Sequence, residues 1–348
     1  MGKKIRMAVI GASLRGIGNV YTRRILENDK TELAGVCEID PEQLKGIAER
    51  YRLPEEMLFT DYKKLLAKGG FDAVCIATSD QVHAQIAIDA MRAGYDVLCE
   101  KPMALKADEC KKMMEAAKET GKNLMVGQIC RFTPSFVLAK KMVDNGEIGD
   151  LFYIESEYAH KYGNVNEGWR VEDPNRNVVV GGGCHAVDLI RWFAGNPSEV
   201  CAFGNQMRCD KWLYDDTTVA TLKFPNGIVG KVMVSGGCIR AYTMRTVLQG
   251  TKGSIVMDNT SPTITVYKDD FMGLEKYYDV PMYRIEHNIP VEINNHNLEA
   301  ELNYFVDCLI EGKTIEIDGV QGCNTVITCN AIVDSSTTGK KIRPTYVE

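Results

Sequence analysis

The fold is indicated most clearly by residues 71–104, FDAVCIATSDQVHAQIAIDAMRAGYDVLCEKPMA. The run Asp72–Thr78 is short and rich in Val, Ile and Ala, which is typical of a parallel strand covered on both faces. Apolar residues at helical spacing over Ala84–Ala93 predict a helix, and Gly94 is suited to end it. Asp96–Cys99 predicts a second strand. This strand–helix–strand order indicates an α/β fold with a parallel sheet.

A charged pair and a proline follow the second strand: Glu100, Lys101 and Pro102. In open α/β sheets, ligands bind beyond the carboxyl ends of the strands, so Lys101 stands where chemistry usually takes place. Pro102 fixes its own φ and disfavours helical geometry at Lys101, which helps to orient the lysine. The alternative from these residues alone is a surface lysine paired with Glu100.

A glycine-containing turn follows the first expected strand, Lys4–Ile10, and precedes an expected helix, Ile17–Asn28. A dinucleotide pyrophosphate needs this order, because the backbone must approach it closely and a helix amino end must face it. Ser13 replaces the usual second glycine and still offers an N–H and a hydroxyl. The candidate cofactor residues of this turn are Gly11, Ala12, Ser13, Leu14, Arg15 and Gly16.

Glu38 directly follows the next expected strand, Leu33–Cys37. It stands roughly 20 residues beyond the glycine turn, as in dinucleotide-binding folds. A carboxylate at this position can accept hydrogen bonds from both ribose hydroxyls and repels a 2′-phosphate. We therefore expect NAD as the cofactor, with NADP disfavoured. Asp40 and Pro41 are expected to begin the following helix.

Length and composition exclude several classes of protein. The chain has 348 residues, enough for two domains, with 45% hydrophobic and 25% charged residues. Its net charge of −6 gives no basic footprint for nucleic acid. No apolar run is long enough to span a membrane, and the first apolar run is too short for a signal peptide. We expect a cytoplasmic protein without nucleic-acid or membrane partners.

The 12 cysteines form no Cys-x-x-Cys pair, and most stand within apolar strands or helices. Cysteine behaves there as a small buried hydrophobe. This usage indicates a reducing compartment, with neither a disulfide framework nor a metal site.

Several short motifs along the chain resemble those of the Gfo/Idh/MocA oxidoreductases, a family named for glucose–fructose oxidoreductase and inositol dehydrogenase. The motifs are the glycine turn, Asp61-Tyr62, Ala77-Thr78 with His83, Glu100-Lys101-Pro102, Val126-Gly127-Gln128, Arg131-Phe132-x-Pro134 and Gly146-Glu147-Ile148-Gly149. The resemblance covers essentially the whole chain. It implies an NAD-binding Rossmann domain over residues 1–125. It also implies an α+β domain over residues 126–348, whose open, mainly antiparallel sheet binds substrate and supports oligomerisation.

The resemblance also implies roles for individual residues of the first domain. Lys101 is implied to contact the reacting hydroxyl and the nicotinamide ribose, as a catalytic, cofactor-binding and substrate-binding residue. The other implied cofactor contacts are Ala77, Thr78, Ser79, His83, Glu100 and Gln128.

Residues 178–192, VVVGGGCHAVDLIRW, predict a helix that carries His185 and Asp188 on one face. His185 matches a family histidine that helps the lysine to handle the substrate proton. Many relatives have an aspartate four residues earlier, where this chain has Gly181. Proton transfer therefore stays open: His185 alone, Lys101, or a group on the expected strand Gly149–His160 can perform it. Asp188 is interpreted as a structural residue.

The expected substrate contacts come from several segments of the second domain. The loop Lys161–Asn177 is long enough to be a binding loop, and Trp169 within it is either a contact or a core anchor. His287 and His296 are interpreted as surface histidines. The candidate substrate residues are Lys101, Arg131, Tyr158, His160, Trp169, Arg170 and His185.

The expected function is an NAD-dependent oxidoreductase that transfers hydride between NAD and a ring CH–OH group of a sugar, glycoside or cyclic polyol, including C3 oxidation of a glycoside. One alternative is glycoside cleavage by oxidation, elimination and re-reduction with NAD recycled in place. A non-catalytic sensor on the same scaffold is the other alternative. Relatives often pair their open sheets, so a homodimer or homotetramer is expected.

Overall fold

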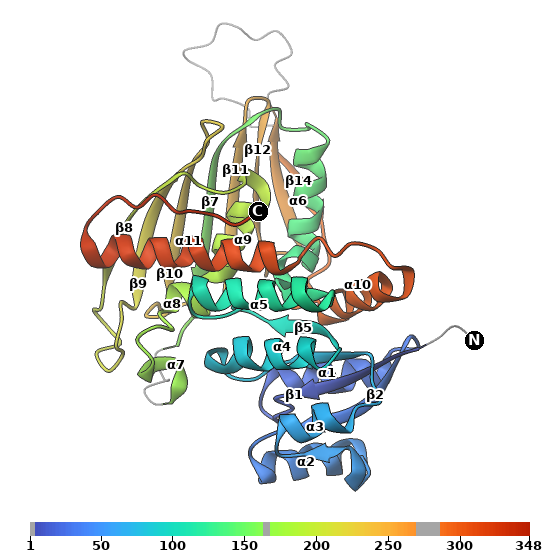
Figure 1. The fold of residues 1–348 in the computed structure, drawn as a ribbon. Coiled ribbons are helices and arrows are strands. Elements are labelled where there is room, and N and C mark those ends of the chain that lie inside the picture. Colours follow the sequence, from blue (N-terminus) through green and yellow to red (C-terminus); the bar gives the residue numbers. More distant parts are fainter. Residues whose placement is uncertain (1–3, 163–167, 269–285) are drawn as a thin grey trace, which may run out of the picture. The chain divides into compact units, whose positions relative to one another are not determined.

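The computed structural model describes residues 4–162, 168–268 and 286–348, and the chain divides into two compact units (Figure 1). Unit 1 comprises Met1–Ile129, Asn297–Asn330 and Tyr346–Glu348, and unit 2 comprises Cys130–His296 and Ala331–Thr345. The division differs from the predicted domains because residues late in the chain belong to unit 1.

Unit 1 is built on a six-stranded sheet in the order β3-β2-β1-β4-β5-β6, with all neighbouring strands parallel. Its strands are β1 Ile5–Ile10, β2 Thr31–Cys37, β3 Leu58–Phe59, β4 Ala73–Ile76, β5 Asp96–Glu100 and β6 Leu124–Gly127. Ile10 lies opposite both Cys37 and Ile76, so the carboxyl ends of β1, β2 and β4 are level. The strand order reverses between β1 and β4, which is the point where such sheets bind ligands. The predicted Rossmann fold is confirmed.

The helices of unit 1 alternate with these strands, and two more come from the carboxyl-terminal part of the chain. They are α1 Ile17–Glu27, α2 Pro41–Tyr51, α3 Tyr62–Lys68, α4 His83–Arg92, α5 Ala107–Thr120, α10 Leu298–Glu311 and α11 Gly319–Thr338, of which α11 ends in unit 2. Short 3-10 turns lie at Glu55–Met57, Asp80–Val82 and Ile129–Phe132. Residues of α3, α4, α5 and α11 share one apolar core cluster with the strands, whereas α1 contacts β1 and α10.

Two helix starts show how local sequence sets these boundaries. The Asp40 carboxylate accepts hydrogen bonds from the backbone N–H groups of Glu42 and Gln43, so α2 begins where the Asp-Pro pair predicts. By contrast, α11 begins at Gly319, although the sequence predicts a helix only over Asn324–Thr337. Asp318 caps it by accepting a hydrogen bond of 3.0 Å from the backbone N–H of Gln321.

Unit 2 contains an eight-stranded sheet in the order β14-β13-β12-β11-β7-β10-β9-β8. The strands are β7 Leu151–Ala159, β8 Glu199–Asn205, β9 Thr217–Lys223, β10 Val229–Ser235, β11 Arg245–Gly250, β12 Gly253–Asp258, β13 Thr263–Lys268 and β14 Glu286–Pro290. The β7–β10 pair is parallel and the other pairs of this sheet are antiparallel. The predicted mainly antiparallel sheet is confirmed.

Helices cover one face of this second sheet. The helices of unit 2 are α6 Pro134–Asp144, α7 Trp169–Glu172, α8 Val178–Gly181 and α9 Cys184–Ala194. α9 contacts β7 and β10, and α6 contacts β12 and β13 (Figure 1). In β9, buried residues such as Ala220 alternate with exposed ones such as Val219, so the opposite face of the sheet is open.

Three further expectations can be compared with this structure. All twelve cysteines are free thiols. Among the described residues, no helix combines the length and the apolarity that crossing a membrane requires. The predicted loop Lys161–Asn177 includes the short helix α7, and its residues 163–167 lie outside the described residues.

Candidate functional site

The glycine turn after β1 is folded tightly between the ends of β2 and β4. The backbone N–H groups of Gly11 and Ala12 donate hydrogen bonds of 2.8 and 3.0 Å to the carbonyl oxygen of Cys37. Gly11 has a φ of +90°, and a Cβ atom there would lie 2.6 Å from the carbonyl carbon of Ala77. Only glycine fits at this position, so the turn exposes backbone at the sheet edge where a pyrophosphate is expected.

A second glycine, Gly18, allows α1 to approach this turn. A Cβ atom at Gly18 would lie 2.1 Å from the carbonyl oxygen of Gly11, whereas at Gly16 the nearest atom is 3.5 Å away. The close helix–strand contact therefore occurs at Gly18, which the sequence analysis did not single out. The feature of the sequence that points to this contact is a further glycine within the first turn of the expected helix. Gly16 is the N-cap of α1 without a side-chain cap, so the helix amino end can receive an anion.

The remaining turn residues mainly anchor the turn to α2. The Ser13 hydroxyl donates a hydrogen bond of 3.2 Å to Gln43 Oε1. The Leu14 side chain fills the space beside Gly46, where a Cβ atom would lie 2.2 Å from Leu14 Cδ1. Arg15 is exposed. Ser13 thus holds the turn in place through its side chain and through its carbonyl oxygen, which accepts a hydrogen bond of 3.0 Å from the Gly16 N–H.

Glu38 and Gln128 supply carboxylate and amide oxygens at the same edge of the sheet. Glu38 is 8% exposed, and its Oε1 atom accepts a hydrogen bond of 3.1 Å from the backbone N–H of Asp40. Gln128 follows β6 and is buried, and its Oε1 atom has no hydrogen-bond partner among the described residues. A tight turn that begins at Gly11, an uncapped helix end and an unpaired acceptor fit a dinucleotide.

His83 connects the two loops that end β4 and β5. Its ring is buried, with Nδ1 2.9 Å from the Pro102 carbonyl oxygen and Nε2 3.2 Å from the Thr78 carbonyl oxygen. Burial lowers the pKa of His83, but Cys99, Asp80 and the Pro102 carbonyl outweigh burial and raise it to about 10. Because both ring nitrogens face carbonyl oxygens, a doubly protonated ring satisfies both contacts. His83 thus holds Ala77, Thr78 and Ser79 against the lysine loop.

Lys101 directly follows the carboxyl end of β5 and is half-buried. Its backbone N–H donates a hydrogen bond of 3.1 Å to Glu100 Oε2, and its peptide bond to Pro102 is cis. The Glu100 side chain points into the core, where Oε1 accepts a hydrogen bond of 2.9 Å from the hydroxyl of Tyr21. Glu100 is therefore buried, in contrast to the surface position that the alternative interpretation gave it. Tyr21 belongs to α1 and stands in none of the sequence motifs that predict the site.

In unit 2, His185 lies in the first turn of α9 and is 2% exposed. Its Nδ1 atom is 3.5 Å from the sulfur of Cys130, and its ring stacks on Tyr158 at 6.1 Å between centroids. The approach is permitted by Gly182, where a Cβ atom would lie 2.7 Å from the Tyr158 ring. The triple glycine before α9 thus packs the helix start closely against β7.

Tyr158 and His185 belong to a larger group of rings, which we call the ring cluster: Tyr158, His160, Tyr162, His185, Tyr242 and His296. The Tyr158 hydroxyl is 3.1 Å from His160 Nδ1 and 2.9 Å from the Tyr162 hydroxyl. Burial raises the pKa of Tyr158 well above its usual value. Tyr158, His160 and His185 are thus brought together. Tyr242 was missed because it is distant in sequence from these residues, whereas Tyr162 lies only two residues beyond His160 and was simply not singled out.

His296 is exposed, as the sequence analysis assumed, yet it also contacts the ring cluster. Its Nε2 atom is 3.3 Å from the Tyr242 hydroxyl, and its ring centroid is 6.3 Å from that of His185. His287 is exposed in β14. His296 therefore joins the edge of the candidate substrate region.

Trp169 and Arg170 stack on each other in α7, and a second arginine lies over the same ring. The guanidinium carbons of Arg170 and Arg176 are 4.3 and 5.0 Å from the Trp169 ring centroid. Arg176 is only 5% exposed, and its guanidinium carbon lies 2.4 Å from where a Cβ atom at Gly181 would stand. A buried cation thus fills the space next to the position at which many relatives have an aspartate.

Arg131 forms a buried ion pair with Asp188. Arg131 Nε and Nη2 each donate a hydrogen bond of 2.8 Å to one Asp188 carboxylate oxygen. The side chains of Arg131 and Asp188 are 7% and 0% exposed. This bidentate geometry gives both residues a structural role in unit 2, as expected for Asp188. Substrate binding by Arg131 stays a prediction.

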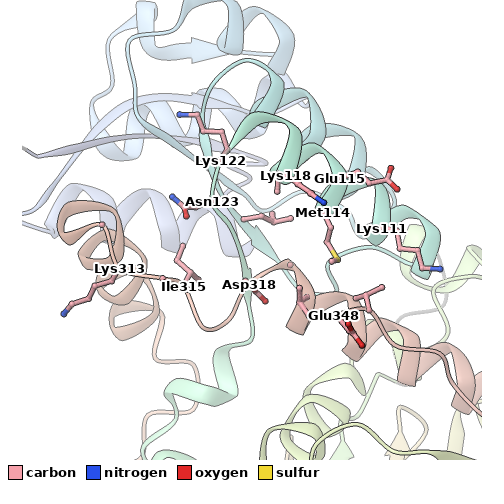
Figure 2. A pocket seen from close by; sticks show the side chains of 17 residues that line it. Lys111, Met114, Glu115, Lys118, Lys122, Asn123, Lys313, Ile315, Asp318 and Glu348 are labelled. Carbon is pink, nitrogen blue, oxygen red and sulfur yellow. The ribbon is translucent and has the colours of Figure 1, made fainter.

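A pocket of about 790 Å³ lies elsewhere in unit 1 (Figure 2). It is lined by residues of α5 such as Lys118, by the start of β6 at Leu124, and by the segment from Gly312 to Val320 (Figure 2). Leu124 begins β6, whereas Gln128 follows its other end. The pocket therefore lies at the amino end of β6, away from the edge where ligands bind in this fold.

Comparison with known proteins agrees with this geometry. Residues 5–128 match the family described as "Oxidoreductase family, NAD-binding Rossmann fold", and residues 136–256 match the GFO/IDH/MocA C-terminal domain. The chain is 31% identical over 299 residues to "Uncharacterized oxidoreductase YrbE" of Bacillus subtilis, covering 80% of this chain and 84% of that protein. It is 28% identical to inositol 2-dehydrogenase 2 of Saccharopolyspora erythraea, covering 78% of this chain and 77% of that protein.

Among solved structures, levoglucosan dehydrogenase in complex with NADH superimposes with a TM-score of 0.87 at 22% identity, covering 99% of this chain and 100% of that chain. At 22% identity, this match is evidence for the fold alone. The family matches, the YrbE relative and the dinucleotide geometry of unit 1 together establish that the chain belongs to the Gfo/Idh/MocA family of NAD-binding oxidoreductases.

Proposed function

We propose that this protein transfers hydride between NAD and a ring CH–OH group of a sugar, glycoside or cyclic polyol. The observation that carries the proposal is the family match over residues 5–128, together with the dinucleotide cradle at Gly11 and Gly18. Relatives named inositol 2-dehydrogenase and levoglucosan dehydrogenase support the substrate class.

In this proposal Lys101 handles the proton of the reacting hydroxyl. When bound, NAD supplies the hydride acceptor. The substrate O–H bond releases its proton as the C–H bond on the same carbon releases hydride, and the Lys101 amine accepts that proton. Glu100 fixes the backbone N–H of Lys101, and His83 fixes the carbonyl of the following Pro102. Hydrogen bonds therefore hold the backbone on both sides of the Lys101 side chain, at its own N–H and at the Pro102 carbonyl.

His185 and the ring cluster are proposed to bind the hydroxyl-bearing face of the substrate. Imidazole and phenol groups both donate and accept hydrogen bonds, and their rings pack against the C–H face of a cyclic substrate. We propose that His185 hydrogen-bonds the reacting hydroxyl or its neighbour. Because Gly181 carries no acid and Arg176 fills the adjacent space, we assign the proton to Lys101 in preference to a histidine–aspartate pair.

The function is tested by measuring NADH formation with purified protein, NAD, and separate panels of free sugars, glycosides and inositols. Steady NADH formation with one class supports the proposal and names the substrate. Aglycone release from a glycoside without net NADH identifies the alternative in which NAD is recycled in place. Nucleotide binding without any turnover across all panels contradicts the enzymatic proposal and favours a sensor.

The cofactor preference is tested at Glu38. Glu38→Gln removes the charge that repels a 2′-phosphate and keeps the side-chain size, so the preference for NAD over NADP is expected to fall by about tenfold or more. The measurement is the ratio of kcat/KM values with the two cofactors. Glu42→Gln, an exposed change in the first turn of α2, is the matched control. An unchanged ratio in Glu38→Gln contradicts the role of Glu38.

We further propose that the protein forms homo-oligomers through the open face of the unit 2 sheet. Phe203, Val219 and Met233 stand opposite one another across β8, β9 and β10, and Phe203 is 80% exposed. Phe203→Glu is expected to reduce the mass measured by light scattering to that of a smaller assembly. Phe152→Glu is the control, since Phe152 is 50% exposed but points to the other face of its strand, β7. An assembly lost equally in both variants contradicts the proposed face.

A further inference from the structure

Three buried side chains in unit 1 form a chain of contacts that ends at the backbone of Lys101. The Tyr21 hydroxyl lies 2.6 Å from Glu301 Oε2 and 2.9 Å from Glu100 Oε1. The other oxygen of Glu100, Oε2, accepts the backbone N–H of Lys101 at 3.1 Å. Tyr21 comes from α1, Glu100 ends β5 and Glu301 lies in the first turn of α10. Neither Tyr21 nor Glu301 stands in one of the sequence motifs described above.

The proton count of this group is constrained by its geometry. A tyrosine hydroxyl carries one proton and can donate it to only one acceptor. Two carboxylates, both ionised, therefore cannot both accept a hydrogen bond from Tyr21. Both short contacts are satisfied when one carboxyl group is itself protonated and donates to the Tyr21 oxygen. Two carboxyl groups that share one site favour this single-proton state in general.

The surroundings identify Glu301 as the group that carries the proton. Glu301 is 0% exposed, and its Oε1 atom has no hydrogen-bond partner among the described residues. This atom would lie 3.4 Å from a Cβ atom at Gly127, so it points at the backbone of β6. Glu100, by contrast, accepts hydrogen bonds at both of its oxygens, which stabilise its ionised form.

The titration of Glu301 agrees with this assignment. Burial, followed by the charge of Glu100, raises the pKa of Glu301 to about 8, against the smaller opposing effects of Tyr21 and Lys101. The groups that interact with Glu301 are Tyr21 from α1, Cys75 from β4, and Glu100 and Lys101 at the end of β5. Burial and both carboxylates raise the pKa of Tyr21 well above its usual value, so its hydroxyl stays protonated.

We propose that Glu301 is a neutral acid which donates to Tyr21, that Tyr21 donates to Glu100, and that this directed chain positions Lys101. The chain leaves one negative charge beside Lys101 instead of two. It also fixes the Glu100 oxygen that holds the Lys101 backbone. Tyr21 and Glu301 are thus positioning residues. The consequence for Lys101 rests on the proposed function, whereas the protonation of Glu301 does not.

Protonation of Glu301 is tested by infrared spectroscopy of the full-length protein at about pH 6 and about pH 10, across the titration of the group. The wild-type protein is expected to lose a protonated-carboxyl band between these conditions, and Glu301→Gln to lack that band. Glu299→Gln, an exposed change in the same helix turn, is the control that keeps it. A band that survives unchanged in Glu301→Gln overturns the proposal.

Thermal stability gives a second readout that needs no substrate. Because the pKa of Glu301 is raised from 4.5 to about 8 in the folded protein, the folded state binds an extra proton between these values. The stabilisation is complete below pH 4.5 and is lost as the pH rises through about 8. The Tm of the wild-type protein is therefore expected to fall relative to that of Glu301→Gln across this window. Parallel Tm curves overturn the proposal.

The positioning of Lys101 is tested by kinetics. Tyr21→Phe removes only the bridging hydroxyl, and we expect kcat to fall by about ten- to a hundredfold while the Kd for NADH changes little. Glu301→Gln, which imitates the protonated acid, is expected to retain more kcat than Glu301→Ala. Unchanged kcat in Tyr21→Phe overturns the positioning role. If no substrate is turned over at all, the proposed function fails, while the infrared and Tm results still decide the protonation of Glu301.

Discussion

Asp188→Ala is expected to lower the free energy of unfolding by about 3–5 kcal/mol, the usual cost of removing one partner of a buried ion pair. Asp188 is fully buried and binds Arg131 through two hydrogen bonds of 2.8 Å. Arg191 lies 3.9 Å from the same carboxylate. Removing the carboxylate leaves two buried guanidinium groups near each other without this counter-charge.

Chemical denaturation monitored by fluorescence measures this cost. The control is Asp144→Ala, which removes the acid from the exposed Lys140–Asp144 ion pair on α6, and we expect it to cost less than about 1 kcal/mol. If Asp188→Ala does not fold, Asp188→Asn provides a milder form of the same test. Replacing both partners by apolar residues, as in Arg131→Met with Asp188→Leu, is expected to recover part of the loss. Equal costs for Asp188→Ala and Asp144→Ala contradict the structural role.

Lys101→Met is expected to lower kcat by about 10²- to 10⁴-fold, the usual contribution of a positioned acid–base group. Methionine keeps much of the side-chain volume but cannot accept a proton. Because the turn at Gly11 and the amino end of α1 are unchanged, the Kd for NADH is expected to stay within about threefold. Single-turnover kinetics measures the chemical step, and quenching of protein fluorescence measures NADH binding.

One further variant separates the charge of Lys101 from its proton transfer. Lys101→Arg keeps the positive charge, but a guanidinium does not give up its proton in proteins, so kcat is expected to stay low. Lys112→Met, on the exposed side of α5, is the control and is expected to retain wild-type kinetics. Equal losses of kcat and of NADH affinity in Lys101→Met assign the lysine to cofactor binding instead of to proton transfer.

Much of the fold could be predicted because its signals are local. The apolar run Asp72–Thr78 and the helical spacing over Ala84–Ala93 correspond to β4 and α4, within a few residues at each end. The Asp40 cap and the alternating pattern of the second domain are likewise contained in short stretches. Patterns of this kind reflect the periodicity of side chains along a helix or a strand. A short stretch of sequence is enough to show that periodicity.

The domain boundaries could not be predicted in the same way. α10 is amphipathic and its sequence predicts a helix, but the pattern does not say which sheet its apolar side contacts. In the structure α10 contacts α1 and β1, and so belongs to unit 1. Burial of a helix face depends on the partner that covers it, which lies nearly 300 residues away in the chain.

The sequence by itself therefore determined the nucleotide fold, the glycine turn, the position of Lys101 after β5 and the family of the protein. Only the tertiary structure showed that Gly18 makes the close contact, that Arg176 fills the space beside Gly181, and that Tyr21 lies between Glu100 and Glu301. The physical reason is the range of the interactions. Motifs reflect local backbone geometry, whereas a shared proton or a buried cation depends on atoms that only folding brings within hydrogen-bond distance.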